Sequence, residues 1–75
     1  MELAIAHIAP AWYIALYCPA EHRYLDSTHT FVSSHAALSY VTHWLAQGAT
    51  IRERSQAMYR ALVAEAAQGA AVVSV

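Results

Sequence analysis

The stretch that decides the fold lies near the N-terminus, where residues 12–27 read WYIALYC, then PAEH, then RYLDS. Residues 12–18 are rich in β-branched and aromatic side chains and are followed by a proline, which predicts a strand. A second extended segment runs from Arg23 to about Ser27 and resumes at residues 31–32. The four residues between the two segments have the length of a short hairpin loop. The stretch therefore predicts an antiparallel β-hairpin.

The register of this hairpin follows from keeping a carboxylate out of the core. A four-residue loop pairs Tyr17 with Tyr24, and Ile14 with Ser27, because opposite residues of an antiparallel pair share a face. A three-residue loop would instead set Asp26 opposite Ile14 on the apolar face, without a partner for its charge. We therefore predict the four-residue loop. The core face then carries Trp12, Ile14, Leu16 and Leu25.

The other face of the hairpin, called the tyrosine face below, is the predicted binding surface. Tyrosine combines a large contact area with a hydroxyl group and a low ordering entropy, as interfaces require. If helices covered this face, its tyrosines would belong to the core. The opposite face is more apolar and only two helices are available, so we expect the tyrosine face to be exposed. Its members are Tyr13, Ala15, Tyr17, Tyr24, Asp26 and Thr28.

The first expected helix follows the hairpin. Ser33 or Ser34 is a suitable N-cap, and the helix should run to about Ala46 before Gly48 ends it. Its apolar stripe consists of Ala37, Leu38, Val41, Trp44 and Leu45.

A second helix is expected to start at Thr50, because Thr50 and Glu53 have the spacing of a capping box. It should continue to about Gln68, before Gly69. Arg52, Gln56 and Arg60 would form a charged row on its solvent side, and we include Arg52 and Arg60 among the candidate partner-binding residues.

The two ends of the chain complete the predicted fold. Residues 2–8 are expected to form a short edge strand or an extended arm, because Pro10 interrupts them. Residues 71–75 are apolar and predict a short C-terminal strand that could pair with a second copy. The chain thus predicts one α+β domain over residues 1–75, a hairpin or three-stranded antiparallel sheet packed by two helices.

Composition limits the classes of function. The 75 residues are 59% hydrophobic and 12% charged, too apolar for a disordered segment. Four arginines and no lysine against five acids give a net charge of −1, so binding to nucleic acid is not expected. Residues 3–20 lack charge, but Pro10 and Pro19 favour two strands over a membrane span. With no basic signal region at the N-terminus, we expect a cytoplasmic protein.

Cysteine and histidine provide no convincing catalytic or metal site. Cys18 is the only cysteine, which excludes an intrachain disulfide and a multi-cysteine zinc site. His35 and His43 lie about 12 Å apart along one helix, too far to share an ion. Cys18, His22 and Asp26 resemble a nucleophile, base and carboxylate, but the hairpin register separates them. We therefore expect no metal, no cofactor and no enzymatic activity.

These observations favour a small protein-binding regulator or inhibitor that acts through the tyrosine face, alone or as a homodimer. Free-standing domains of this size are often encoded by mobile genetic elements. One alternative is a nucleic-acid module that stacks bases on its tyrosines and binds phosphates through its arginines. Another is a small enzyme or metal-binding protein that uses Cys18 and histidines.

Overall fold

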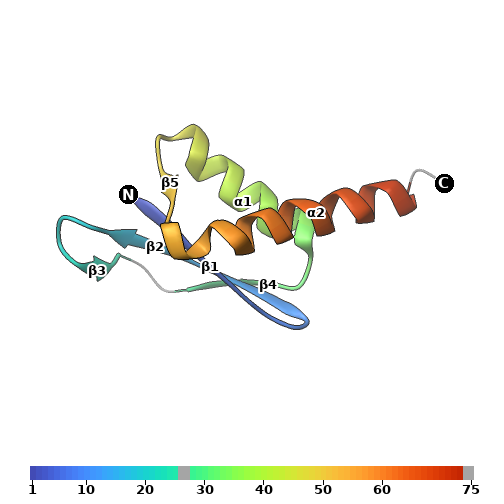
Figure 1. Cartoon of the computed structure of the whole chain (residues 1–75), viewed down its shortest axis with the longest axis horizontal. Coiled ribbons are helices and arrows are strands. Elements are labelled where there is room, and N and C mark those ends of the chain that lie inside the picture. The colour runs from blue at the N-terminus through green and yellow to red at the C-terminus, as the bar shows by residue number, and fades with distance from the viewer. Residues whose placement is uncertain (26–27, 74–75) are drawn as a thin grey trace.

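The computed structural model describes the backbone of residues 1–25 and 28–73, and side chains in these ranges as far as Gln68. Within them a mixed sheet and two helices form two layers, with both helices on the same side of the strands (Figure 1). This arrangement confirms the α+β class. The elements are β1 (Glu2–Ile8), β2 (Ala11–Cys18), β3 (Arg23–Tyr24), β4 (His29–Phe31), α1 (Ser34–Ala46), β5 (Thr50–Ile51), the 3₁₀ turn η1 (Glu53–Ser55) and α2 (Gln56–Val73).

The hairpin between β2 and β3 has the predicted register. Tyr17 pairs with Tyr24, and the loop between the strands contains four residues. Leu25 continues the pairing, because its backbone N–H donates to the carbonyl oxygen of Leu16 at 2.9 Å. His22 closes the loop with a positive φ of 52°, in the left-handed region.

Beyond Leu25 the pairing differs from the prediction. Ile14 faces His29 rather than Ser27. From the contact between Leu16 and Leu25 to this pair, β2 covers two residues and the opposite chain covers four. Ser27 and Asp26 lie outside the described residues. The pairing is shifted by two residues from the prediction. Because two is an even number, each residue of β4 stays on the face of the sheet that the prediction gave it. Thr30 therefore lies opposite Tyr13 on the tyrosine face.

β1 is an inner strand of the sheet over its first residues, not an arm. It pairs with β2 along its whole length and with β5 in parallel at Glu2 and Leu3, in the sheet order β3-β2-β1-β5. Past β5, the hydroxyl oxygen of Ser55 accepts the N–H of Ile5 at 2.9 Å. Leu3 and Ile5 are buried on the side of the helices, which explains why this segment joins the sheet.

The first helix agrees with the prediction. The Ser33 hydroxyl oxygen accepts the N–H of Ala36 at 3.3 Å, as an N-cap does. Gly48 follows the helix with a φ of +98°, a conformation that favours glycine. The helix buries Ala37 and Val41 against β2 and α2. The main cluster of buried apolar side chains consists of Leu3, Ile5, Trp12, Ile14, Leu16, Ala37, Val41, Ala49 and Leu62.

The predicted capping box at Thr50 is wrong. Thr50 lies in β5, where its N–H donates to the carbonyl oxygen of Met1 at 3.1 Å. The N–H of Arg52 likewise donates to the carbonyl oxygen of Leu3, at 3.0 Å. These sheet hydrogen bonds hold the backbone extended where a helix was expected. The α-helix α2 therefore begins only at Gln56, after the turn Glu53–Ser55.

The predicted C-terminal strand is also wrong, because α2 continues to Val73. A glycine within a helix costs only about 1 kcal/mol relative to alanine. The alanines on both sides of Gly69 favour helix, so the glycine does not end it. Residues 74–75 lie outside the described part of the chain. The proposed pairing of two copies through this segment loses its structural basis.

Candidate functional site

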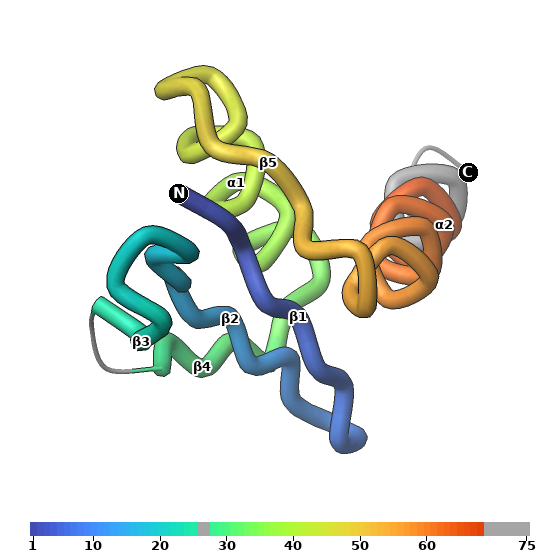
Figure 2. Tube along the Cα trace, turned by 60° about the vertical axis from the view of Figure 1, so that its left-hand side comes forward, coloured from blue at the N-terminus to red at the C-terminus, as the bar shows by residue number. Residues whose placement is uncertain are grey.

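The two faces of the sheet have different surroundings. Ile14 and Trp12 on the core face are 0% and 1% exposed beneath the helices. On the tyrosine face, Tyr13 and Tyr17 are half-buried and Tyr24 is 54% exposed. Figure 2 shows α1 and α2 together on one side of the β1–β2 ladder. Among the described residues, no helix covers the tyrosine face.

Tyr17 is held at the centre of a small group of contacts. Its ring meets that of Tyr24 edge-on, with the ring centroids 5.1 Å apart. The guanidinium carbon of Arg52 lies 3.8 Å from the centroid of the Tyr17 ring. Arg52 also approaches Glu2, with 3.7 Å between Nε and Oε1. Pairing between β5 and β1 thus brings Arg52 to the tyrosine face.

The charged row predicted for the second helix does not form as a unit. Arg52 precedes the helix and belongs to the tyrosine face, whereas Arg60 lies on α2 and is exposed. Gln56, in the first turn of α2, donates through its side-chain amide to the carbonyl oxygen of Ile51 at 3.2 Å. The structure therefore brings together Tyr17, Tyr24 and Arg52, and leaves Arg60 on another element. Asp26 lies outside the described residues.

A shallow hollow of about 250 Å³ opens on the tyrosine face. Tyr13 and Tyr24 line it together with alanines of β1 and β2. Ala4 and Ala6 line this hollow, and the sequence did not single them out. In the sequence, these alanines alternate with Leu3 and Ile5, which indicates that they lie on the opposite face of a strand. This pattern places them on the tyrosine face only if β1 is known to pair with β2. The lining residues are Ala4, Ile5, Ala6, Tyr13, Ala15, Tyr24 and Thr28.

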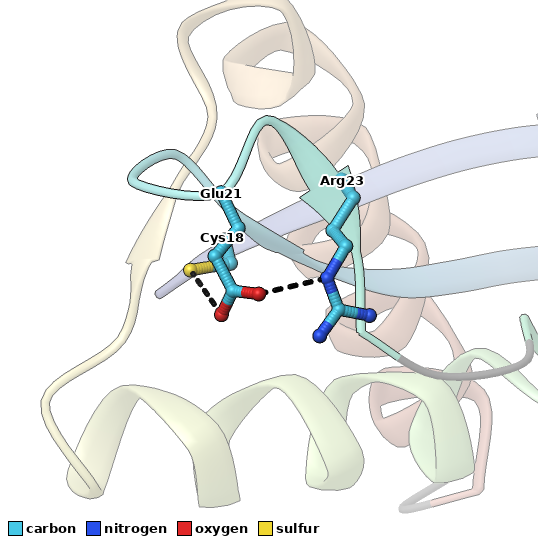
Figure 3. A network of polar contacts seen from close by, with 3 residues as sticks. All are labelled: Cys18, Glu21 and Arg23. Carbon is cyan, nitrogen blue, oxygen red and sulfur yellow. Dashed lines mark hydrogen bonds and ion pairs between the residues drawn. The ribbon is translucent and has the colours of Figure 1, made fainter.

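A second polar cluster lies in the loop of the β2–β3 hairpin (Figure 3). The sulfur of Cys18 is 3.8 Å from Oε2 of Glu21, and Arg23 Nε donates to Oε1 of Glu21 at 2.9 Å. Reactive cysteines need positive surroundings that favour the thiolate. Here Arg23 is engaged with the carboxylate of Glu21, which itself lies between the arginine and the sulfur.

The histidines have mostly aromatic neighbours. The ring of His7 stacks on that of Trp12 with centroids 3.9 Å apart, and His29 lies 4.8 Å from Tyr40. The indole N–H of Trp12 donates to Oε2 of Glu65 at 3.1 Å, which ties β2 to α2. Within residues 1–25 and 28–73, no three histidine, cysteine, aspartate or glutamate side chains gather closely enough to hold a metal ion.

No protein-family model, curated protein or solved structure matches this chain. In the described part of the chain, no helix is both long and apolar enough to cross a membrane.

Proposed function

We propose that this chain is a small protein-binding regulator or inhibitor whose partner docks on the tyrosine face. One observation carries the proposal: both helices pack on the same face of the sheet, and the opposite face presents Tyr13, Tyr17 and Tyr24. Exposed aromatic patches on small proteins usually have a use, since they otherwise promote aggregation.

The chemistry of this face favours a protein partner. Tyrosine and arginine are, with tryptophan, the side chains enriched among residues that dominate binding energy. Among the described residues of the face, the charge of Arg52 lies beside that of Glu2. Arg23 is likewise paired with Glu21. A partner that carries a phosphate backbone would need several free cations on one surface, so a protein surface is the better match.

The setting we propose is the cytoplasm. Cys18 is a free thiol, and free thiols persist in a reducing compartment.

Affinity capture from the native host, followed by mass spectrometry, tests the proposal when tyrosine-face and control variants are compared. Tyr24→Ala removes an exposed ring and should weaken capture of the partner by about 2 kcal/mol or more in binding free energy. Its free energy of unfolding should fall by only about 1 kcal/mol, because the lost contact is one aromatic pair.

The matched control is Val63→Ala, which truncates another exposed apolar side chain, 39% accessible, on the helix α2. It should capture the same partner as the wild type. Equal capture by the wild type and Tyr24→Ala would remove the tyrosine face from consideration.

A further inference from the structure

β4 forms a border of the sheet, because in the described part of the chain it pairs with β2 and with no other strand (Figure 2). The carbonyl oxygen of Leu16 in β2 accepts the N–H of Leu25, so it points away from β1. Backbone groups alternate in direction along a strand, so those of Ile14 also point away from β1, toward its partner His29 in β4. The N–H and C=O of Thr30, the next residue of β4, therefore point outward from the sheet.

The outer edge of β4 lacks the usual protection against another strand. Edge strands are commonly blocked by proline, by charged side chains or by a covering element. Residues 28–32 read THTFV, without proline, lysine, arginine or an acid, and every second residue is β-branched, which favours a strand. Thr30 is exposed and Val32 is 73% exposed. The opposite edge differs, because Ser55 accepts the outward N–H of Ile5 there.

The same five residues complement a second copy of themselves. In an antiparallel pair centred on Thr30, the two Thr30 residues lie opposite each other and exchange both backbone hydrogen bonds. Thr28 then lies opposite Val32 of the second copy, and His29 lies opposite Phe31 of the second copy. Threonine pairs and aromatic pairs are favourable across strands, and β-branched side chains pack well on such a surface. No like charges meet in this register, because the five residues contain no acid, lysine or arginine.

We infer that two copies of this chain pair antiparallel through β4, about a two-fold axis at Thr30. The axis is perpendicular to the sheet, so the two sheets become one, with both tyrosine faces on the same side. The contact uses the edge of the sheet and leaves the tyrosine face open, so it goes beyond the proposed function. The edge is about 17 Å long and buries less than the roughly 800 Å² per partner of a stable interface. Association should therefore be weak and reversible.

Sedimentation equilibrium at protein concentrations up to about 1 mM tests the inference. The wild type should pass from monomer to dimer within this range. Thr30→Pro removes the outward N–H, and an edge strand tolerates proline where the N–H faces solvent. This variant should fold and should dimerise at least tenfold more weakly. Thr30→Val is the matched control, because it keeps the N–H and the β-branched shape, and its dimerisation should stay within threefold of the wild type.

Hydrogen exchange of the Thr30 amide provides a second, residue-specific measurement. In the monomer this N–H faces solvent, whereas in the dimer it donates to Thr30 of the second copy. Its exchange should therefore slow as the concentration of the wild type rises, and the exchange of the exposed Arg54 amide should not. An exchange rate of Thr30 that does not change while the protein dimerises would place the interface elsewhere.

Two further results would overturn the inference. A wild type that stays monomeric throughout the concentration range would exclude the dimer, and a dimer unaffected by Thr30→Pro would exclude this edge. If Thr30→Pro does not fold, Thr30→Lys takes its place, because it sets two like charges opposite each other across the axis. Thr30→Lys should weaken dimerisation at least tenfold at low salt, and unchanged dimerisation of this variant would contradict the pairing through β4.

Discussion

The two faces of the sheet can be compared at neighbouring residues of one strand. Ile14 is fully buried under the helices, whereas Tyr13, next to it in β2, lines a hollow on the open side. The alternation of side chains assigns each residue to a face, but it does not decide which face is covered. That depends on where α1 and α2 pack. The core face stabilises the fold, whereas no helix in the described part of the chain packs on the tyrosine face.

The largest expected effect is a difference in the free energy of unfolding between variants of the two faces. Ile14→Ala should lower the free energy of unfolding by about 2–5 kcal/mol, because it leaves a cavity in the core. Tyr24→Ala should lower it by about 1 kcal/mol, the value of an aromatic pair. Urea unfolding of both variants measures the difference. Equal losses would mean that Tyr24 is as much a part of the core as Ile14.

A second variant tests how the helical layer is attached to the edge of β1. Ser55 is buried, and its hydroxyl oxygen accepts the N–H of Ile5. Ser55→Ala leaves that N–H without a partner and should cost about 1–3 kcal/mol in unfolding free energy. Ser39→Ala, at an exposed position of α1, is the control and should change stability by less than about 0.5 kcal/mol. If the two variants unfold alike, the contact between Ser55 and Ile5 is not formed in solution.

A third comparison concerns the helix caps. Ser33→Ala should cost about 1 kcal/mol, because it removes the acceptor for the N–H of Ala36. Thr50→Ala should cost less than about 0.5 kcal/mol, because Thr50 is exposed and lies in β5. Thermal or urea unfolding distinguishes them. A larger loss for Thr50→Ala would restore the capping box and contradict β5.

The smallest expected effect lies on the tyrosine face itself. Arg52→Gln removes the cation from the Tyr17 ring and should cost about 0.5–1 kcal/mol. Arg54→Gln, in the same turn but exposed, should be close to neutral. If the unfolding transitions of the two variants coincide, Arg52 does not help to hold Tyr17 in place.

Local sequence signals predicted the hairpin and the first helix because their causes are local. The loop length set the pairing of Tyr17 with Tyr24, and Ser33 and Gly48 mark the ends of α1. The signal at Thr50 failed because a long-range contact took precedence: β5 pairs with β1, which lies nearly fifty residues earlier.

The candidate site was predicted in part for the same reason. The tyrosines share one face because side chains alternate along β2 and β3, and the register of the hairpin is enough to predict this. Ala4 and Ala6 join the tyrosines because β1 pairs with β2. Arg52 joins them because β5 pairs with β1. Residues 2–8 were expected to be an edge strand or an arm, so the place of Ala4 and Ala6 on the tyrosine face could not be foreseen.

Site-specific crosslinking tests the central claim, that the partner docks on the tyrosine face, most directly. The photoreactive residue p-benzoylphenylalanine can replace Tyr24 on the tyrosine face or, in a second variant, the exposed Arg60 on α2. After irradiation in the native host, the crosslinked products are identified by mass spectrometry. We predict a discrete crosslinked partner from position 24 and none from position 60. A partner crosslinked from position 60 alone would place the binding surface on the helical side and contradict the account.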